Sequence, residues 1–210
     1  MKKLVFAAFL VAVCVNAGAQ VQLLSSLKSV STNDVAFPCL KTWQSETLSR
    51  YQKDCLIEPK FSLWSEIETE PLRTLFPQYR FFTVSWDEIP GPSAGAKQVG
   101  MAFGLYVILA VGTQTNNISS FFGHGNYEEF GRFLNENKVR IRTEKDARTV
   151  WTAFCDFHQK RWENQGIERK TANIWHLGVI RIDKFLYYYE VIVDGDGGVQ
   201  NAKLHADAVK

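Results

Sequence analysis

The fold class is decided by the stretch from Trp175 to His205, which reads WHLGVIRIDKFLYYYEVIVDGDGGVQNAKLH. It holds three runs rich in β-branched and aromatic residues, and these runs are separated by short polar turns at 183–184 and 194–198. Alternate residues of the middle run, beginning with Tyr187, share one face of an extended chain. The pattern predicts an antiparallel meander of three strands. The expected strands cover residues 175–182, 186–193 and 199–205.

Two helices are predicted immediately before this meander. Asn126 can cap the first helix while Glu129 reaches back to it, and Thr143 can pair with Asp146 in the same way at the second. Apolar residues after Thr143 recur at steps of three and four up to Trp162, which places them on one helix face. We therefore expect one helix after residue 126 and another over 144–162.

The first half of the chain repeats this order of elements. Apolar spacing predicts helices over 40–54 and 61–76, with Pro38 stopping any regular element before them. Aromatic and apolar runs predict three strands, at residues 79–86, 104–111 and 118–122. The expected class is α+β, with two three-stranded antiparallel meanders packed against helices. The arrangement could be a duplicated helix-plus-three-strands unit.

The N-terminus has the layout of a secretory signal peptide. A basic start at Lys2 and Lys3 precedes an uncharged apolar run over 4–15, and small residues follow up to Ala19. The run is too short for a membrane span, which needs about 20 residues. We expect a signal peptide over 1–19, export to the periplasm or the medium, and no stable membrane anchor after cleavage. Residues 20–210 are expected to form a single α+β domain, with possible halves at 20–125 and 126–210.

The charge balance argues against polyanionic partners. The 24 lysines and arginines exceed the 22 aspartates and glutamates by two, and Lys2 and Lys3 account for this excess. Electrostatic attraction to nucleic acid or to an anionic membrane is therefore not expected. We expect no cofactor, and a small molecule or a protein as the partner.

One pentapeptide offers an enzymatic alternative. Gly91-Pro92-Ser93-Ala94-Gly95 fits the G-x-S-x-G nucleophile elbow, and His176 and His205 follow downstream. An elbow requires a strand that runs directly into its first glycine, whereas residues 87–90 separate the predicted strand from Gly91. A surface loop is the favoured interpretation. A small secreted serine hydrolase using Ser93 and His176 remains the alternative function.

Cys155 and His158 suggest half of a metal site. They lie three residues apart on the last predicted helix, and His124 or His176 could complete a zinc ligand set. The same helix face is apolar, however, and both residue types are common in cores. We favour burial and expect no metal.

Gly123-His124-Gly125 is the favoured binding segment. The two glycines leave the backbone around His124 accessible, and the segment stands just before a helix start. No complete set of nucleophile, base and orienting group is apparent in the chain. The first expectation is thus an exported, non-catalytic protein that binds a ligand or a partner, with contacts at Gly123, His124 and Gly125.

Cys39 and Cys55 could form a disulfide in an exported protein. A continuous helix between them would hold them roughly 24 Å apart, whereas a disulfide needs the two Cα atoms within about 7 Å. The bridge therefore requires the helix to begin near Ser45, with residues 39–44 doubling back.

Overall fold

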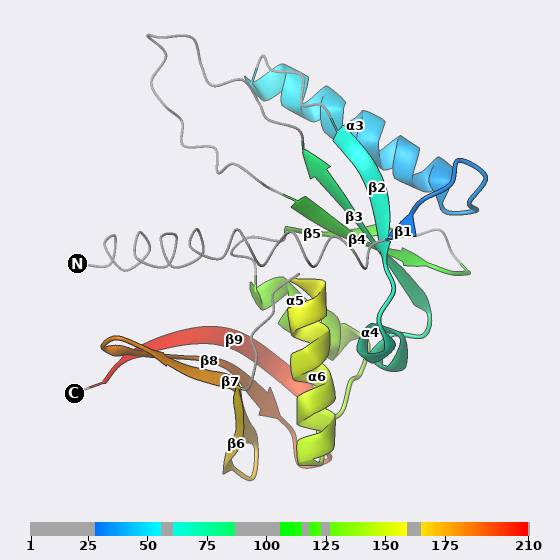
Figure 1. Cartoon of the computed structure of the whole chain (residues 1–210). Coiled ribbons are helices and arrows are strands. Elements are labelled where there is room, and N and C mark those ends of the chain that lie inside the picture. The colour runs from blue at the N-terminus through cyan, green and yellow to red at the C-terminus, as the bar shows by residue number, and fades with distance from the viewer. Residues whose placement is uncertain are drawn as a thin grey trace, which may run out of the picture.

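The computed structural model describes residues 28–55, 61–86, 106–114, 118–122, 127–158 and 165–209, and their elements stack in four layers (Figure 1). Helix α3 (Phe37–Cys55) covers one face of a five-stranded sheet. Three further helices lie between this sheet and a second sheet of four strands. They are α4 (Glu70–Leu75), α5 (Tyr127–Glu136) and α6 (Glu144–Phe157).

The five-stranded sheet is an antiparallel meander in the order β1-β2-β3-β4-β5. Its strands are β1 (Lys28–Ser29), β2 (Phe61–Ile67), β3 (Tyr79–Trp86), β4 (Tyr106–Gly112) and β5 (Ile118–Phe122). Helix α3 connects β1 to β2, and the short α4 connects β2 to β3. Strands that follow one another in the chain are therefore neighbours throughout this sheet.

The second sheet is also a meander, in the order β6-β7-β8-β9. Its strands are β6 (Gly166–Thr171), β7 (Ile174–Ile182), β8 (Phe185–Val193) and β9 (Val199–Ala208). The predicted turns connect them at 183–184 and 194–198, and Asp183 adopts a left-handed φ of 52° in the first. In the second turn, Oδ1 of Asp194 accepts hydrogen bonds from the backbone N–H groups of Asp196 and Gly198.

The predicted α+β class is confirmed, and both sheets are antiparallel as expected. Each sheet contains more strands than the three that the sequence predicts, because β1, β2 and β6 were missed. A helix followed by an antiparallel meander occurs in both halves, as α3 with β2–β5 and as α6 with β6–β9. The described residues contain no helix with both the length and the apolar composition needed to cross a membrane.

The prediction of a helix over 61–76 is wrong for its first half. Residues Phe61–Ile67 form β2, which pairs with β1 on one side and β3 on the other, and only Glu70–Leu75 are helical. Pairing on both sides supplies backbone hydrogen bonds that outweigh the helical spacing of a short apolar run.

The expectation that Pro38 stops any regular element is also wrong. Pro38 lies in the first turn of α3, where its missing N–H group needs no partner.

The predicted start of α6 is confirmed in detail. Thr143 accepts a hydrogen bond from the backbone N–H of Asp146, and the Asp146 carboxylate accepts one in return from the Thr143 N–H. Burial alone would raise the pKa of Asp146, but the backbone N–H groups of Arg142 and Thr143 outweigh it and lower that pKa. This reciprocal capping box fixes where α6 begins and thus which face it presents to the sheets.

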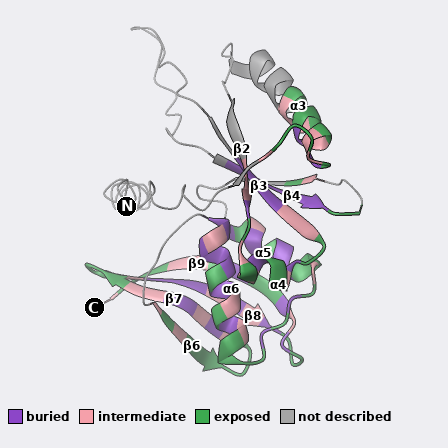
Figure 2. Cartoon of the chain, turned by 45° about the vertical axis from the view of Figure 1, so that its right-hand side comes forward, coloured by how far each residue is buried: buried purple, intermediate pink, exposed green. Residues whose placement is uncertain are grey.

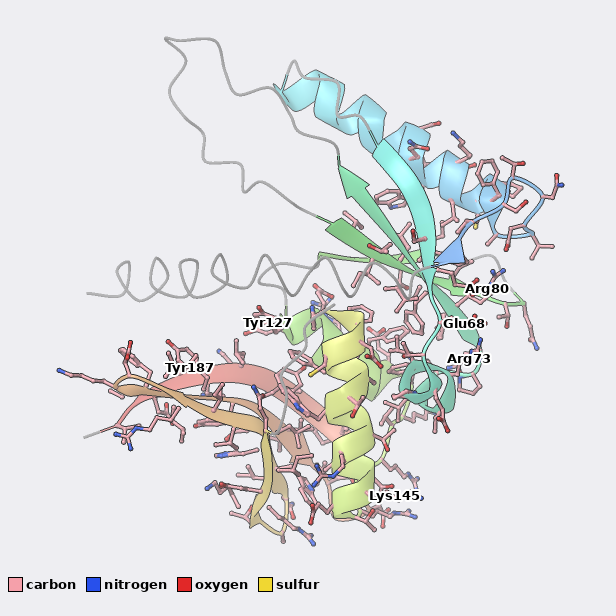
Figure 3. The ribbon with its side chains drawn as sticks, in the orientation of Figure 1. Glu68, Arg73, Arg80, Tyr127, Lys145 and Tyr187 are labelled. Carbon is pink, nitrogen blue, oxygen red and sulfur yellow. The ribbon has the colours of Figure 1, made fainter. Side chains whose placement is uncertain are left out.

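Arg80 holds the segment before α3 onto the first sheet. Arg80 is labelled in Figure 3, near the start of β3. Its guanidinium donates to both oxygens of Asp34 and both oxygens of Glu66, at 2.7–2.8 Å, and lies over the Phe82 ring. These two carboxylates raise the pKa of Arg80 above its ordinary value. The cluster is satisfied internally, which favours a structural role.

The main core lies between the two sheets and is continuous from one to the other. Phe81 and Ile108 of the first sheet share one buried cluster with Phe130 and Phe154 of the helices and Tyr189 of the second sheet. A smaller cluster on the other face of the first sheet packs under α3. In Figure 2 the buried positions line the helix surfaces and the strands that face them, whereas β6 is exposed along most of its length.

Candidate functional site

The most distinctive polar cluster of the described residues lies on the face of the second sheet that points away from the helices. The opposite face is buried against α5 and α6, through residues such as Leu177, Tyr189 and Val191. Alternate positions of the same strands therefore point outward. We call this surface the outer face and define it by Glu168, His176, Tyr188, Glu190, His205 and Asp207.

Three rings stack across the outer face. The His176 ring on β7 lies on the Tyr188 ring of β8, with centroids 3.9 Å apart and planes inclined by 17°. On the other side of Tyr188, the His205 ring of β9 is nearly parallel, at 5.3 Å and 6°. Strand register explains this stack. Tyr188 pairs directly with His205 of β9. Glu190, the next residue of β8 on the same face, pairs with His176 of β7. Stacked side chains on neighbouring strands stabilise a sheet, and the Tyr188 residue at the centre of this stack is itself buried, with 7% of its surface exposed.

Glu190 links the two histidines. Nε2 of His176 lies 3.3 Å from one carboxylate oxygen of Glu190, and Nε2 of His205 lies 3.4 Å from the other. His176 lies within hydrogen-bonding distance of its oxygen, whereas His205 only approaches the other oxygen of the same carboxylate.

Tyr188 has a second carboxylate partner. Its hydroxyl donates to Oδ2 of Asp207 at 2.6 Å. Burial, the hydrogen bond to Asp207 and the charges of Asp207 and Glu190 raise the pKa of Tyr188 to about 12. The tyrosine is consequently held as a neutral donor over the whole physiological range.

We expect Tyr188→Phe to reduce the loss of stability at high pH. A raised folded-state pKa means that the neutral Tyr188 stabilises the fold below about pH 10, the ordinary tyrosine pKa. That contribution is lost as the pH rises from there through about 12. Urea unfolding at a series of alkaline pH values should therefore show a shallower decline for Tyr188→Phe than for the unchanged protein. An equally steep decline in stability for both proteins would contradict the raised pKa of Tyr188.

The chemistry available on the outer face is binding. The Tyr188 ring stacks with both imidazoles, and the Nε2 atoms of both approach the Glu190 carboxylate. No group of three His, Cys, Asp or Glu side chains in the part of the chain described by the structure is placed to hold a metal ion. The face offers stacked rings and hydrogen-bonding carboxylates.

The residues predicted for the serine hydrolase are only partly placed by the structure. His176 and His205, proposed as alternative bases, lie on opposite sides of the Tyr188 ring, and both approach Glu190. Ser93 and the rest of the 91–95 pentapeptide lie outside the described residues. The predicted binding segment of Gly123, His124 and Gly125 also lies outside them, as does the predicted signal peptide over 1–19.

Cys155 and His158 belong to the core. Cys155 is buried on α6, and His158 is fully buried at the C-terminal end of the same helix. The His158 ring is surrounded by the rings of Tyr127, Phe154 and Phe157, at centroid distances of 4.5–5.2 Å. Both residues thus fill the apolar stripe of α6, as the favoured interpretation expected.

The predicted Cys39–Cys55 disulfide is not formed. Both cysteines lie in the single helix α3, which begins at Phe37 and not near Ser45. Sixteen residues of helical rise separate them by roughly 24 Å, so the doubling back that a bridge requires does not occur. Cys39 is a free thiol whose Sγ donates to the backbone oxygen of Ala36, and burial raises the pKa of this thiol.

No protein-family model, no curated protein and no solved structure matches this chain. The site must therefore be interpreted from its own geometry. Sequence reasoning named His176 and His205 but missed Tyr188, Glu190 and Asp207. The alternation in the β8 stretch already places Tyr188 and Glu190 on one face, and this signal could have found them.

Proposed function

We propose that the protein is an exported, non-catalytic binding protein that uses the outer face to bind a protein partner. The observation that carries this proposal is the three-ring stack of His176, Tyr188 and His205 on a sheet face that no described helix covers. Aromatic side chains are enriched at protein interfaces, whereas small-molecule sites are concave.

The surroundings of the stack support the same proposal. Half-buried apolar residues flank it on the outer face, with Ile174 and Ile192 toward one end and Leu186 toward the other. Charged side chains, including Glu168 and Lys203, lie on the outer strands β6 and β9. Aromatic and apolar side chains together with charged side chains at the edge are common features of protein–protein interfaces.

Site-specific photo-crosslinking tests the binding face. A photoreactive p-benzoylphenylalanine replaces Asn201, which is exposed on β9 opposite Ile192, and as a matched control it replaces Lys41, exposed on α3 in the opposite layer. In cells that naturally make the protein, we expect a discrete protein adduct from position 201 and none from position 41. The adduct should decrease strongly when His176→Ala and His205→Ala are combined.

The controls make each outcome informative. Circular dichroism of the double variant shows whether the sheet is retained. An adduct that persists in a folded double variant, equal adducts from both positions, or no adduct from position 201 would each contradict the proposed face. An adduct with a small molecule instead of a protein would show that the partner bound at this face is a small molecule.

A covalent serine probe tests the non-catalytic part of the proposal. A fluorophosphonate probe is expected to leave Ser93 unlabelled in the folded protein, because residues 87–90 separate the pentapeptide from the preceding strand, whereas an activated elbow serine directly follows a strand. Clean labelling that disappears in Ser93→Ala would overturn the proposal and favour the secreted hydrolase.

A further inference from the structure

The second sheet ends in two edge strands that differ in how well they are protected. Strand β6 is short and exposed, carries Glu168, Arg169 and Lys170 in succession, and shifts register twice against β7. Charge, short length and irregular pairing are the usual means by which an edge strand avoids further pairing. Strand β9 has ten residues, and its register with β8 is unbroken from Asn201 to Ala208. The β9 edge is therefore the better template for an added strand.

A hydrogen bond just after β9 shows which of its backbone groups face outward. The N–H of Val209 donates to the Lys184 oxygen at 2.7 Å. Hydrogen-bonded and non-hydrogen-bonded positions alternate along an antiparallel strand, so the odd-numbered residues of β9 from 201 onward bond to β8. The backbone N–H and C=O groups of the even-numbered residues Leu204, Ala206 and Ala208 consequently point to the free edge.

Helix α5 covers only the first part of this edge. Nδ2 of Asn135 donates to the Gln200 oxygen at 2.9 Å. Gly131 approaches β9 so closely that a Cβ atom on it would lie 2.8 Å from the Ala202 oxygen. Beyond these contacts β9 continues past α5 toward the C-terminus (Figure 1), and in the described part of the chain β8 is the only strand that pairs with it there. We call residues 203–208 the free stretch.

The free stretch is complementary in charge to a second copy of itself. Lys203 and Asp207 lie on one face of β9, at equal distances on either side of His205. If two copies pair antiparallel with His205 opposite its own counterpart, Lys203 of each copy faces Asp207 of the other. The same register places Leu204 opposite Ala206, so the outward backbone groups form hydrogen-bonded pairs. Moving the centre of pairing by one residue in either direction would lose both Lys203–Asp207 pairs.

The contacts that Lys203 and Asp207 already make do not prevent this pairing. Lys203 approaches Glu128 of α5 at 3.5 Å, and both side chains are exposed. Asp207 accepts the Tyr188 hydroxyl at Oδ2 alone. An ammonium group has three donors and a carboxylate has about four acceptor sites, so each can take a further partner. The Lys203–Asp207 positions would be non-hydrogen-bonded pairs, in which opposite side chains come closest.

We propose that two copies of this protein associate along the free stretch of β9, with His205 opposite its own counterpart, and form a dimer. The four-stranded sheets of both copies then become one continuous antiparallel sheet. Directly opposed residues share a face, so the two outer faces lie on the same side of that sheet. The inference goes beyond the proposed function, since it concerns the strand edge, and it would make the outer face bivalent.

Sedimentation equilibrium of the protein purified from cells that make it measures the association. The paired segment is short, so we expect a dissociation constant of about 10–100 μM. Lys203→Glu should weaken the dimer by about tenfold, because it opposes like charges at two symmetric positions. Combining Lys203→Glu with Asp207→Lys restores opposite charges and should recover most of this loss. Lys170→Glu, on the β6 edge, is the matched control and should leave the dimer unchanged.

Two results of this measurement would overturn the proposal. One is a protein that stays monomeric at about 0.5 mM, well above the expected dissociation constant. The other is a dimer that Lys203→Glu weakens no more than Lys170→Glu does, with circular dichroism showing that both variants are folded.

A proline on the free edge tests the backbone pairing independently of charge. Ala206→Pro removes an N–H that points outward, and it leaves the hydrogen bonds between β8 and β9 in place. We expect it to abolish the dimer at about 0.5 mM, whereas Ala206→Val, which keeps the N–H, should retain it. Equal association of the two folded variants would overturn the pairing.

A cysteine at the two-fold axis tests the register. His205→Cys should form a disulfide between two copies on mild oxidation, because the Cα atoms of such a pair lie about 4.5 Å apart. Asn201→Cys is the control on the same face, where the two copies of the position would be roughly 26 Å apart. No more covalent dimer from His205→Cys than from Asn201→Cys would overturn the register.

The dimer and the proposed function fail in different ways. A photo-adduct from position 201 with the mass of two chains is a second copy and supports the pairing, whereas an adduct with a different protein supports the outer face. A protein that is monomeric throughout overturns the pairing and leaves the outer face as the proposed binding surface. A dimer without any adduct to another protein contradicts the proposed function and leaves the pairing in place.

Discussion

Replacing Gly178 with alanine is expected to lower the free energy of unfolding by about 3 kcal/mol or more. Gly178 has a φ of +65°, a left-handed conformation that side chains disfavour, and it lies where the register of β7 against β8 shifts. A Cβ atom there would lie 2.0 Å from the Trp151 ring of α6. Trp151 is itself buried in the main core, so neither the ring nor the strand can move without further cost.

Gly195→Ala is the matched control for this prediction. Its Cβ would meet nothing within 4 Å, in the turn between β8 and β9, so we expect a change within about 0.5 kcal/mol. Urea unfolding followed by circular dichroism measures both variants. Adding Trp151→Leu to Gly178→Ala should recover part of the loss relative to the sum of the single variants, because it removes the clashing ring. Equal effects at positions 178 and 195 would contradict this account.

Phe154→Ala is expected to cost about 3–5 kcal/mol of the free energy of unfolding. The Phe154 side chain is fully buried on α6 and lies at the centre of the main core. Its ring stacks on Trp151 at 5.2 Å and contacts Tyr189 of β8 at 4.4 Å. It also contacts Phe130 of α5 at 5.6 Å, so truncation leaves a cavity where both helices and the second sheet meet.

Phe154→Leu separates volume from ring contacts. Leucine retains most of the apolar volume but loses the aromatic geometry, and we expect a loss of about 1–1.5 kcal/mol. The same unfolding measurement serves for both variants, with the slope of the transition as a check on two-state behaviour. A cost below about 1 kcal/mol for Phe154→Ala would show that the site collapses readily, against the packing described here.

Helix α6 and strands β7–β9 were predictable because their signals are local. The capping residues around Thr143 and the alternation in β8 need only neighbouring residues to be interpreted. Strand β2 was not predictable in this way, because its pairing with β1 and β3 depends on segments far from it in the chain. Strand β6 was missed because it is an edge strand with five exposed residues out of six, so it carries no apolar alternation.

The candidate site was only half predictable for a related reason. The histidines can be identified as candidate functional residues from the sequence alone. Their proximity to Glu190, by contrast, depends on the register of β7, β8 and β9. The register shift between Leu177 and Ile180, at Gly178, adds an extra residue to β7 and alters the pairing beyond it. A residue-by-residue count across the hairpin would have missed this shift.

The continuous core has a consequence for the order in which the chain becomes stable. Strands β1–β5 are synthesised before α5 and α6. The apolar sheet face that carries Phe81 and Ile108 therefore remains exposed until the second half of the chain has been synthesised. We expect early intermediates to expose this face, and nascent chains released before α6 to be prone to aggregation. A chaperone that keeps the chain unfolded until synthesis is complete would remove this hazard, and the finished chain could then close both sheets over the helices in one cooperative step.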